Sequence, residues 1–149
     1  MEKIKNILFV CTGNTCRSPM AEAIFQAMAQ KAGLDCTAKS AGIAVGTEGR
    51  QASAEAVEAL KKMKIDLCAH STVSIRRIEL DSVDLFVAMT MEHANMLMNL
   101  GVPKNKIYVM NIPDPFGGSQ QTYDECSERI SGEVEKLIAL IKDNNEGKA

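Results

Sequence analysis

Hydrophobic and polar positions along the chain follow two periods in turn, one typical of strands and one typical of helices. Residues 4–10 contain the unbroken apolar run Ile7–Val10, as expected of a strand that is covered on both faces. Shorter apolar runs predict further strands at residues 36–40, 85–89 and 106–110. The sequence therefore predicts four strands.

Helical periodicity fills the intervals between these strands. Pro19 follows Ser18 and suits the first turn of a helix, and Ser53 and Thr90 can cap a second and a third helix. A fourth, amphipathic helix is predicted over residues 122–142. Strands that alternate with helices predict an α/β fold with a mostly parallel sheet and helices on both faces.

Composition limits the classes of protein to consider. The 149 residues, 46% of them hydrophobic and 24% charged, predict a single domain over residues 1–149. A net charge of −2 and an aromatic content of 4% give little basis for binding nucleic acid. No apolar run is long enough to cross a bilayer, and the start of the chain does not resemble a secretory signal. We expect a cytoplasmic protein without membrane or nucleic-acid partners.

The cysteines and histidines favour thiol chemistry over a disulfide or metal framework. An odd number of cysteines argues against a disulfide scaffold. The cysteines are Cys11, Cys16, Cys36, Cys68 and Cys126. His70 and His93 are the only histidines, and the cysteines and histidines do not have the spacing of zinc ligands. We expect no metal, and we expect the last three cysteines to serve packing.

The segment VCTGNTCRS at residues 10–18 joins the first strand to the first helix. Its small and polar residues allow successive backbone N–H groups to point inward and form an anion-binding nest, and the helix N-terminus adds a positive dipole end. It lacks the glycine and lysine pattern of a nucleotide-binding loop. The predicted phosphate-binding residues are Thr12, Gly13, Asn14, Thr15, Cys16, Arg17 and Ser18.

Cys11 and Arg17 give this loop its predicted chemistry. The Arg17 guanidinium can bind two oxygens of a tetrahedral oxyanion, and the positive field is expected to lower the pKa of Cys11. A thiolate under a phosphate cradle is an in-line nucleophile on phosphorus, and Ser18 can donate a hydrogen bond to the sulfur when it leaves. The alternative is that Cys11 is only a small buried hydrophobic residue.

The stretch CTGNTCRSPMAE at residues 11–22 resembles the signature of the low-molecular-weight protein tyrosine phosphatase family. Ser40-Ala41-Gly42, His70-Ser71, Met89-Thr90 and the segment DPFGG at residues 114–118 occur in the order found in that family. The resemblance implies a phosphotyrosine protein phosphatase I-like fold, with a four-stranded parallel sheet flanked by helices on both faces. It also implies a cysteinyl-phosphate intermediate, phosphorylated protein substrates, inorganic phosphate as product, and no cofactor or metal.

The resemblance assigns roles to residues outside the loop. Asp114 would protonate the leaving group and then activate water, whereas on its own the Asp-Pro pair is common in turns. Ser40 and His70 would hold Asn14 in the conformation that the loop needs, although His70 could equally be an ordinary half-buried histidine. His93 matches no catalytic position, and we expect it on the solvent side of its helix.

Cys16 has two interpretations. It could form a reversible disulfide with Cys11 and protect that thiol from overoxidation. Alternatively, its side chain could simply pack under the loop.

Thr15 and Phe116 bear on the substrate. Many tyrosine-specific members carry Ile or Leu in place of Thr15, whereas the bacterial branch that acts on phosphoarginine carries Thr and shares the segment Phe116-Gly117-Gly118. The Thr15 hydroxyl and the Asp114 carboxylate can accept hydrogen bonds from guanidinium N–H groups, with Phe116 as a wall. The sequence therefore favours a protein arginine phosphatase, with a protein tyrosine phosphatase as the alternative.

Two other functions are less well supported. Thioredoxin-coupled arsenate reductases share the scaffold but need two resolving cysteines beyond residue 75, and residues 75–98 contain none. A phosphopeptide-binding module without catalysis would not need both Cys11 and Asp114.

Overall fold

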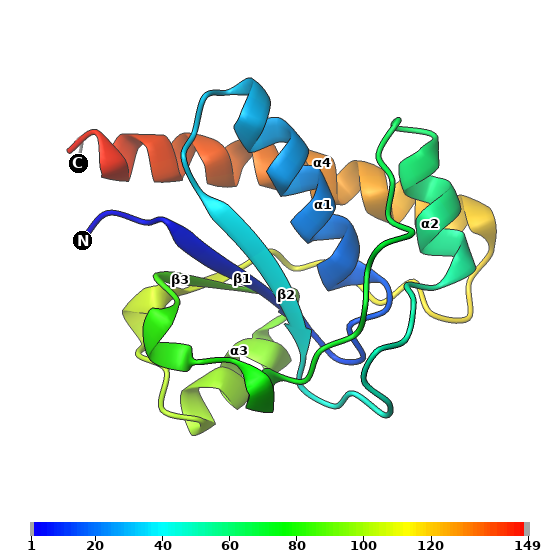
Figure 1. The fold of residues 1–149 in the computed structure, drawn as a ribbon, viewed down its shortest axis with the longest axis horizontal. Coiled ribbons are helices and arrows are strands. Elements are labelled where there is room, and N and C mark those ends of the chain that lie inside the picture. Colours follow the sequence, from blue (N-terminus) through cyan, green and yellow to red (C-terminus); the bar gives the residue numbers. More distant parts are fainter. Residues whose placement is uncertain (1, 148–149) are drawn as a thin grey trace.

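The fold is built on one parallel sheet. The computed structural model describes residues 2–147, so Met1 and residues 148–149, at the ends of the predicted domain, lie outside the described residues. The strands run in the order β2-β1-β3-β4, and all pair in parallel (Figure 1). They are β1 (Asn6–Cys11), β2 (Thr37–Gly42), β3 (Leu85–Ala88) and β4 (Ile107–Val109). The predicted four-stranded parallel sheet is confirmed.

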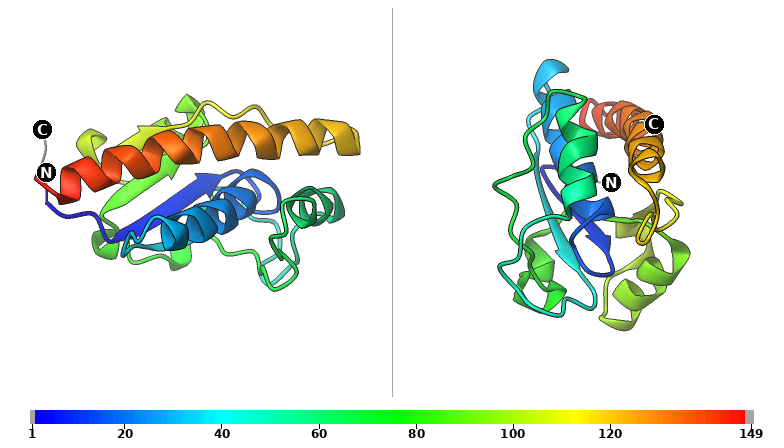
Figure 2. Two further views of the ribbon diagram at one scale, coloured as in Figure 1. Left: turned by 90° about the horizontal axis from the view of Figure 1, so that it is seen from above. Right: turned by 90° about the vertical axis from the view of Figure 1, so that its right-hand side faces the viewer.

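Helices cover both faces of this sheet, as predicted. On one face α1 (Arg17–Lys31), α2 (Ala54–Lys61) and α4 (Gln120–Asn145) pack together, and α3 (Met91–Asn99) lies on the other (Figures 1 and 2). The side chains of β1 alternate between the two cores: Ile7 and Phe9 belong to one, and Leu8 and Val10 to the other. This double burial explains the unbroken apolar run of the strand. Within residues 2–147, no helix has the length and hydrophobicity needed to span a membrane.

The predicted helix caps are present. The Ser53 side chain accepts a hydrogen bond from the backbone N–H of Ala56, and the Thr90 side chain accepts one from the N–H of His93. The first helix begins at Arg17, earlier than predicted, and its N-cap residue Cys16 supplies no side-chain hydrogen bond. Its first amides are therefore open to another acceptor.

The described residues also contain three short 3-10 helices. A three-residue helix is too short to show a hydrophobic period. They span Ile75–Arg77, Leu80–Ser82 and Lys104–Lys106.

The ends of β1 and β2 lie very close together at the carboxyl edge of the sheet. Cys11 pairs with Gly42, and the backbone N–H of Ala44 donates to the carbonyl oxygen of Thr12 at 2.9 Å. A Cβ atom at Gly42 would lie 2.6 Å from that same oxygen. Only glycine leaves enough space for the loop that follows β1 to pass at this distance.

We therefore expect Gly42→Ala to destabilise the protein. The added methyl group must displace backbone as well as side chain, so the free energy of unfolding should fall by about 1–3 kcal/mol in urea denaturation. Gly46→Ala is the matched control, because nothing lies within 4 Å of a Cβ there. Equal stabilities for the two variants would contradict the close approach.

Candidate active site

The loop after β1 and the loop after β4 form one cavity of about 260 Å³. Arg17 and Asp114, which are far apart in the sequence, both face it. Most of the predicted site residues thus lie together at the carboxyl edge of the sheet, where ligands bind in open α/β folds. The lining residues are Cys11, Thr12, Gly13, Thr15, Cys16, Arg17, Asp114 and Phe116.

Cys11 lies at the base of this cavity and is only 3% exposed. Its Sγ is 2.8 Å from Ser18 Oγ. Burial raises the pKa of the Cys11 thiol, while hydrogen bonds from the Ser18 side chain and from the amides of Ser18 and Asn14, and the charge of Arg17, lower it. The net direction is upward, so the expectation of a lowered pKa was wrong: loss of solvent outweighs the nearby donors.

Asn14 organises the loop from behind. Its φ of 60° is in the left-handed region that few residues other than glycine adopt. The side-chain Nδ2 donates to Ser18 Oγ at 2.9 Å and to Ser40 Oγ at 3.0 Å, and Oδ1 accepts from the Val73 N–H at 2.9 Å. Because Ser18 Oγ accepts from Asn14, the Ser18 hydroxyl proton is left to donate to the Cys11 sulfur.

Ser40 and His70 both contact Asn14. His70 Nε2 lies 2.8 Å from the Asn14 carbonyl oxygen; since a carbonyl only accepts, Nε2 must carry the hydrogen. Ser40 Oγ, which accepts from Asn14, donates in turn to Glu22 Oε1. The contacts that the family resemblance implied are therefore present.

Arg17 places a buried positive charge beside the cavity. The residue is 4% exposed, and its Nη1 donates to the Ile112 carbonyl oxygen at 3.1 Å. Its Nη2 lies 3.7 Å from Asp114 Oδ2, on a side chain that is 53% exposed. Asp114 Oδ1 accepts from the Phe116 N–H at 3.0 Å, so this turn holds both Asp114 and the 79% exposed Phe116 at the cavity mouth.

Cys16 packs under the loop. Its Sγ is 3.4 Å from Ser53 Oγ and 3.6 Å from the Tyr123 hydroxyl, and burial together with this thiol raises the pKa of Tyr123. Cys11 and Cys16 are both free thiols in the structure. The packing interpretation is supported, and the regulatory disulfide stays a prediction.

The other cysteines divide into two groups. Cys36 and Cys126 are buried as expected, and burial raises the pKa of Cys126 to about 11. Cys68 is exposed, so its predicted packing role was wrong. It follows α2 in a loop, where no apolar period constrains which side chains face inward.

His93 was placed wrongly on the solvent side of its helix. It is 5% exposed; its Nε2 lies 2.8 Å from Thr12 Oγ1 and its Nδ1 lies 2.8 Å from Thr90 Oγ1. The available signal was its position three residues after a capping threonine that directly follows a strand. A side chain there faces the carboxyl edge of the sheet.

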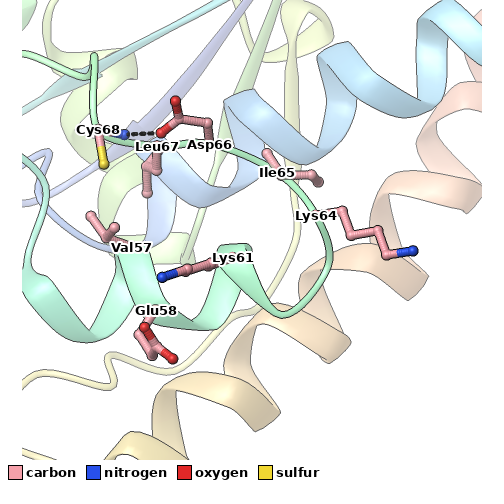
Figure 3. A pocket seen from close by; sticks show the side chains of 8 residues that line it. All are labelled: Val57, Glu58, Lys61, Lys64, Ile65, Asp66, Leu67 and Cys68. Carbon is pink, nitrogen blue, oxygen red and sulfur yellow. Dashed lines mark hydrogen bonds between the residues drawn. The ribbon is translucent and has the colours of Figure 1, made fainter.

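A second hollow, of about 360 Å³, lies between α2 and residues 64–68 (Figure 3). In it, the backbone N–H of Cys68 donates to Asp66 Oδ1 at 2.8 Å. The hydrogen bond with Asp66 raises the pKa of the Cys68 thiol, which disfavours the reactive thiolate. None of the predicted site residues lines this hollow. The loop cavity is therefore the candidate active site.

Comparison with known proteins identifies the family. Residues 6–147 match the family model described as low molecular weight phosphotyrosine protein phosphatase. The chain belongs to this family.

Relatives within the family carry different substrate names. A protein-arginine-phosphatase of Bacillus subtilis is 35% identical, with 92% of this chain and 97% of the relative covered. A crystal structure of a low molecular weight protein tyrosine phosphatase from T. tengcongensis has a TM-score of 0.86 and 41% identity, covering 91% of this chain and 98% of that one.

A YwlE arginine phosphatase variant with a phosphorylated active-site serine has a TM-score of 0.88 and 32% identity, covering 95% of this chain and 98% of that one. A protein named arsenate reductase 1, from Bacillus cereus, is 32% identical, with 91% of this chain and 96% of the relative covered. All of these proteins are similar to this chain over most of its length, whereas the reactions in their names differ.

The hydrogen bond from Ser18 should be measurable in the titration of Cys11. Because this bond lowers the pKa of the thiol, Ser18→Ala should move the thiolate titration to higher pH by about one pH unit. The readout is thiolate absorbance at 240 nm, taken as the difference from the same protein carrying Cys11→Ser.

Ser131→Ala serves as the control, because that hydroxyl bonds to Met63 instead. A titration midpoint in Ser18→Ala that equals the wild-type value would show that Ser18 does not donate to the sulfur.

Proposed function

We propose that this protein is a cysteine-dependent protein phosphatase that hydrolyses phosphoarginine in proteins through a cysteinyl-phosphate intermediate. One observation carries the proposal: Cys11, Arg17 and Asp114 meet around a single cavity. A nucleophile, a cation for the transferred oxyanion and a carboxyl group for proton transfer are the groups that such hydrolysis needs.

In the first step the phosphoryl group binds to the backbone amides of residues 13–18 and to the Arg17 guanidinium. The Cys11 thiol releases its proton to solvent, at a cost from burial that Ser18 and Arg17 reduce. Its sulfur attacks phosphorus in line, and the bond from phosphorus to the guanidinium nitrogen breaks. Asp114, in its protonated form, donates its proton to the departing nitrogen.

In the second step water hydrolyses the cysteinyl-phosphate. The Asp114 carboxylate takes a proton from water as the oxygen attacks phosphorus, and the bond between sulfur and phosphorus breaks. The Ser18 hydroxyl, 2.8 Å from Cys11 Sγ, donates to the thiolate as it leaves. Arginine and inorganic phosphate are the products, and neither step uses a metal or cofactor.

The cavity mouth supports a preference for phosphoarginine. Thr15 presents a small polar side chain to the cavity, whereas a larger apolar side chain there would favour contact with an aromatic ring. Asp114, which is exposed, lines the same cavity. Hydroxyl and carboxylate oxygens can accept hydrogen bonds from guanidinium N–H groups. The resemblance to a protein-arginine-phosphatase supports the same substrate.

Phosphotyrosine is the alternative substrate. Phe116 is highly exposed at the cavity mouth, and its ring could stack on a phosphotyrosine ring. Arsenate reduction is less well supported, because residues 75–98 contain no resolving cysteine. A module that binds phosphopeptides without hydrolysing them would have no use for Asp114 beside Arg17.

The setting that we propose is a single phosphatase domain over residues 1–149, acting in the cytoplasm on phosphorylated proteins. The family match over residues 6–147 and the packing of α4 against α1 and α2 support one domain. The net charge of −2 supports a substrate that is not nucleic acid.

A trapping experiment tests the proposed function. With phosphoarginine and phosphotyrosine peptides supplied in parallel, acid quench of the wild type should yield phosphate on Cys11, and the phosphoarginine peptide should turn over faster. Cys11→Ser should lose turnover by at least about a thousandfold while still binding inorganic phosphate. Full activity of Cys11→Ser, or phosphate on another residue, would overturn the mechanism.

Thr15→Ile tests the substrate preference. An apolar side chain loses the hydroxyl acceptor and adds a surface for an aromatic ring, so the ratio of kcat/KM for phosphoarginine over phosphotyrosine peptides should fall by about tenfold or more. Thr15→Ser, which keeps the hydroxyl, is the matched control. An unchanged ratio in Thr15→Ile would remove Thr15 from the determinants of specificity.

A further inference from the structure

His93 joins the loop after β1 to the start of α3, and the mechanism above does not use it. The imidazole is buried, and both of its nitrogens are occupied: Nε2 lies 2.8 Å from Thr12 Oγ1 and Nδ1 lies 2.8 Å from Thr90 Oγ1. Thr12 directly follows Cys11 and lines the cavity. A residue 81 positions away in the sequence thus holds a side chain of the cavity wall.

The hydrogen bonds that link Thr90, His93 and Thr12 must pair donors with acceptors. Thr90 Oγ1 accepts from the His93 backbone N–H at 3.4 Å, and among the contacts of residues 2–147 the one acceptor for its own hydrogen is His93 Nδ1. With Thr90 as the donor to Nδ1, Nε2 carries the hydrogen and donates it to Thr12 Oγ1; the opposite tautomer reverses both bonds and keeps the same two partners. This fixes the rotamer of Thr12.

The charges around the imidazole favour this neutral form. Burial lowers the pKa of His93 and so does the nearby Arg17 guanidinium, while Glu92 and Asp114 raise it by less. A neutral ring has one donor and one acceptor, which is what a Thr90 donor and a Thr12 acceptor require.

Thr12 differs from the rest of the loop in where it lies. Cys11 and Arg17 are buried, so a phosphoryl group binds at the base of the cavity, whereas Thr12 is exposed and lies at its rim. From the rim, the Thr12 side chain can contact the group that carries the phosphate.

We propose that His93 is a positioning residue that, by holding Thr12, shapes the part of the cavity wall that contacts the substrate's leaving group. This rests on the proposed function. Loss of the hydrogen bond frees Thr12 to change rotamer, which weakens peptide binding in the ground state and the transition state alike. Binding of the oxyanion at the base is unaffected.

Kinetics on the protein test this proposal. His93→Leu should raise KM for the phosphopeptide about fivefold with kcat within twofold of wild type, while the inhibition constant of inorganic vanadate stays unchanged. Thr12→Val should have the same effect, and the double variant should add nothing to either. His93→Gln, which can place a donor near the Nε2 position, should restore KM.

Asn95→Ala, at an exposed position of the same helix, is the control and should match wild type throughout. A wild-type KM in His93→Leu, or effects of His93→Leu and Thr12→Val that multiply in the double variant, would overturn the proposal. So would a parallel loss of vanadate binding, which would indicate a general collapse of the loop.

A readout that needs no turnover separates this inference from the proposed function. Imidazole ¹⁵N NMR should find His93 neutral with hydrogen on Nε2, and Thr12→Val should shift that nitrogen but not Nδ1. No response of the Nε2 resonance to Thr12→Val would overturn the positioning role whatever the kinetics. A wild type that hydrolyses neither phosphopeptide would instead overturn the proposed function, with the NMR result intact.

Discussion

The phosphate loop depends on one side chain, the amide of Asn14. A left-handed conformation at a residue other than glycine costs about 1–3 kcal/mol. The Asn14 side chain offsets that cost by donating hydrogen bonds to Ser18 and Ser40 and accepting one from the Val73 N–H. Both Nδ2 hydrogens and the Oδ1 oxygen have partners in these bonds. Because the amide can only donate from Nδ2, it fixes the direction of the Ser18 hydroxyl and so supplies the Cys11 sulfur with a donor.

Charge is the second constraint on the site. Arg17 is buried, and its contact with Asp114 at 3.7 Å is to a side chain that is half exposed. Burial of a guanidinium is costly when its carboxylate partner is half in solvent, and an oxyanion in the cavity would reduce that cost. The same burial raises the pKa of Cys11. The site therefore keeps the Arg17 cation buried but disfavours the thiolate form of Cys11 when no substrate is bound. The buried cation favours binding of an anionic substrate, and the raised pKa means that Cys11 is not permanently charged.

Two histidines hold the loop from different elements. His70 donates to the Asn14 carbonyl oxygen from the loop before the first 3-10 helix, and His93 bonds to the Thr12 side chain from α3. The resemblance pointed to the first but not to the second, because His93 is recognisable only through its partner. Glu92 before it is exposed and Ala94 after it is buried, so its position between a charged and an apolar residue did not fix which way His93 faces.

The sequence alone determined the order of strands and helices, the two capping residues Ser53 and Thr90, and the anion-binding loop at residues 11–18. These features follow from local periodicity and from residue types at fixed spacing, which act over a few residues of chain. Only the tertiary structure decided that Asp114 lies beside Arg17, that His93 is buried against Thr12, and that the pKa of Cys11 is raised. Each of these depends on distance and on exclusion of water between segments far apart in the sequence, and no local pattern encodes either.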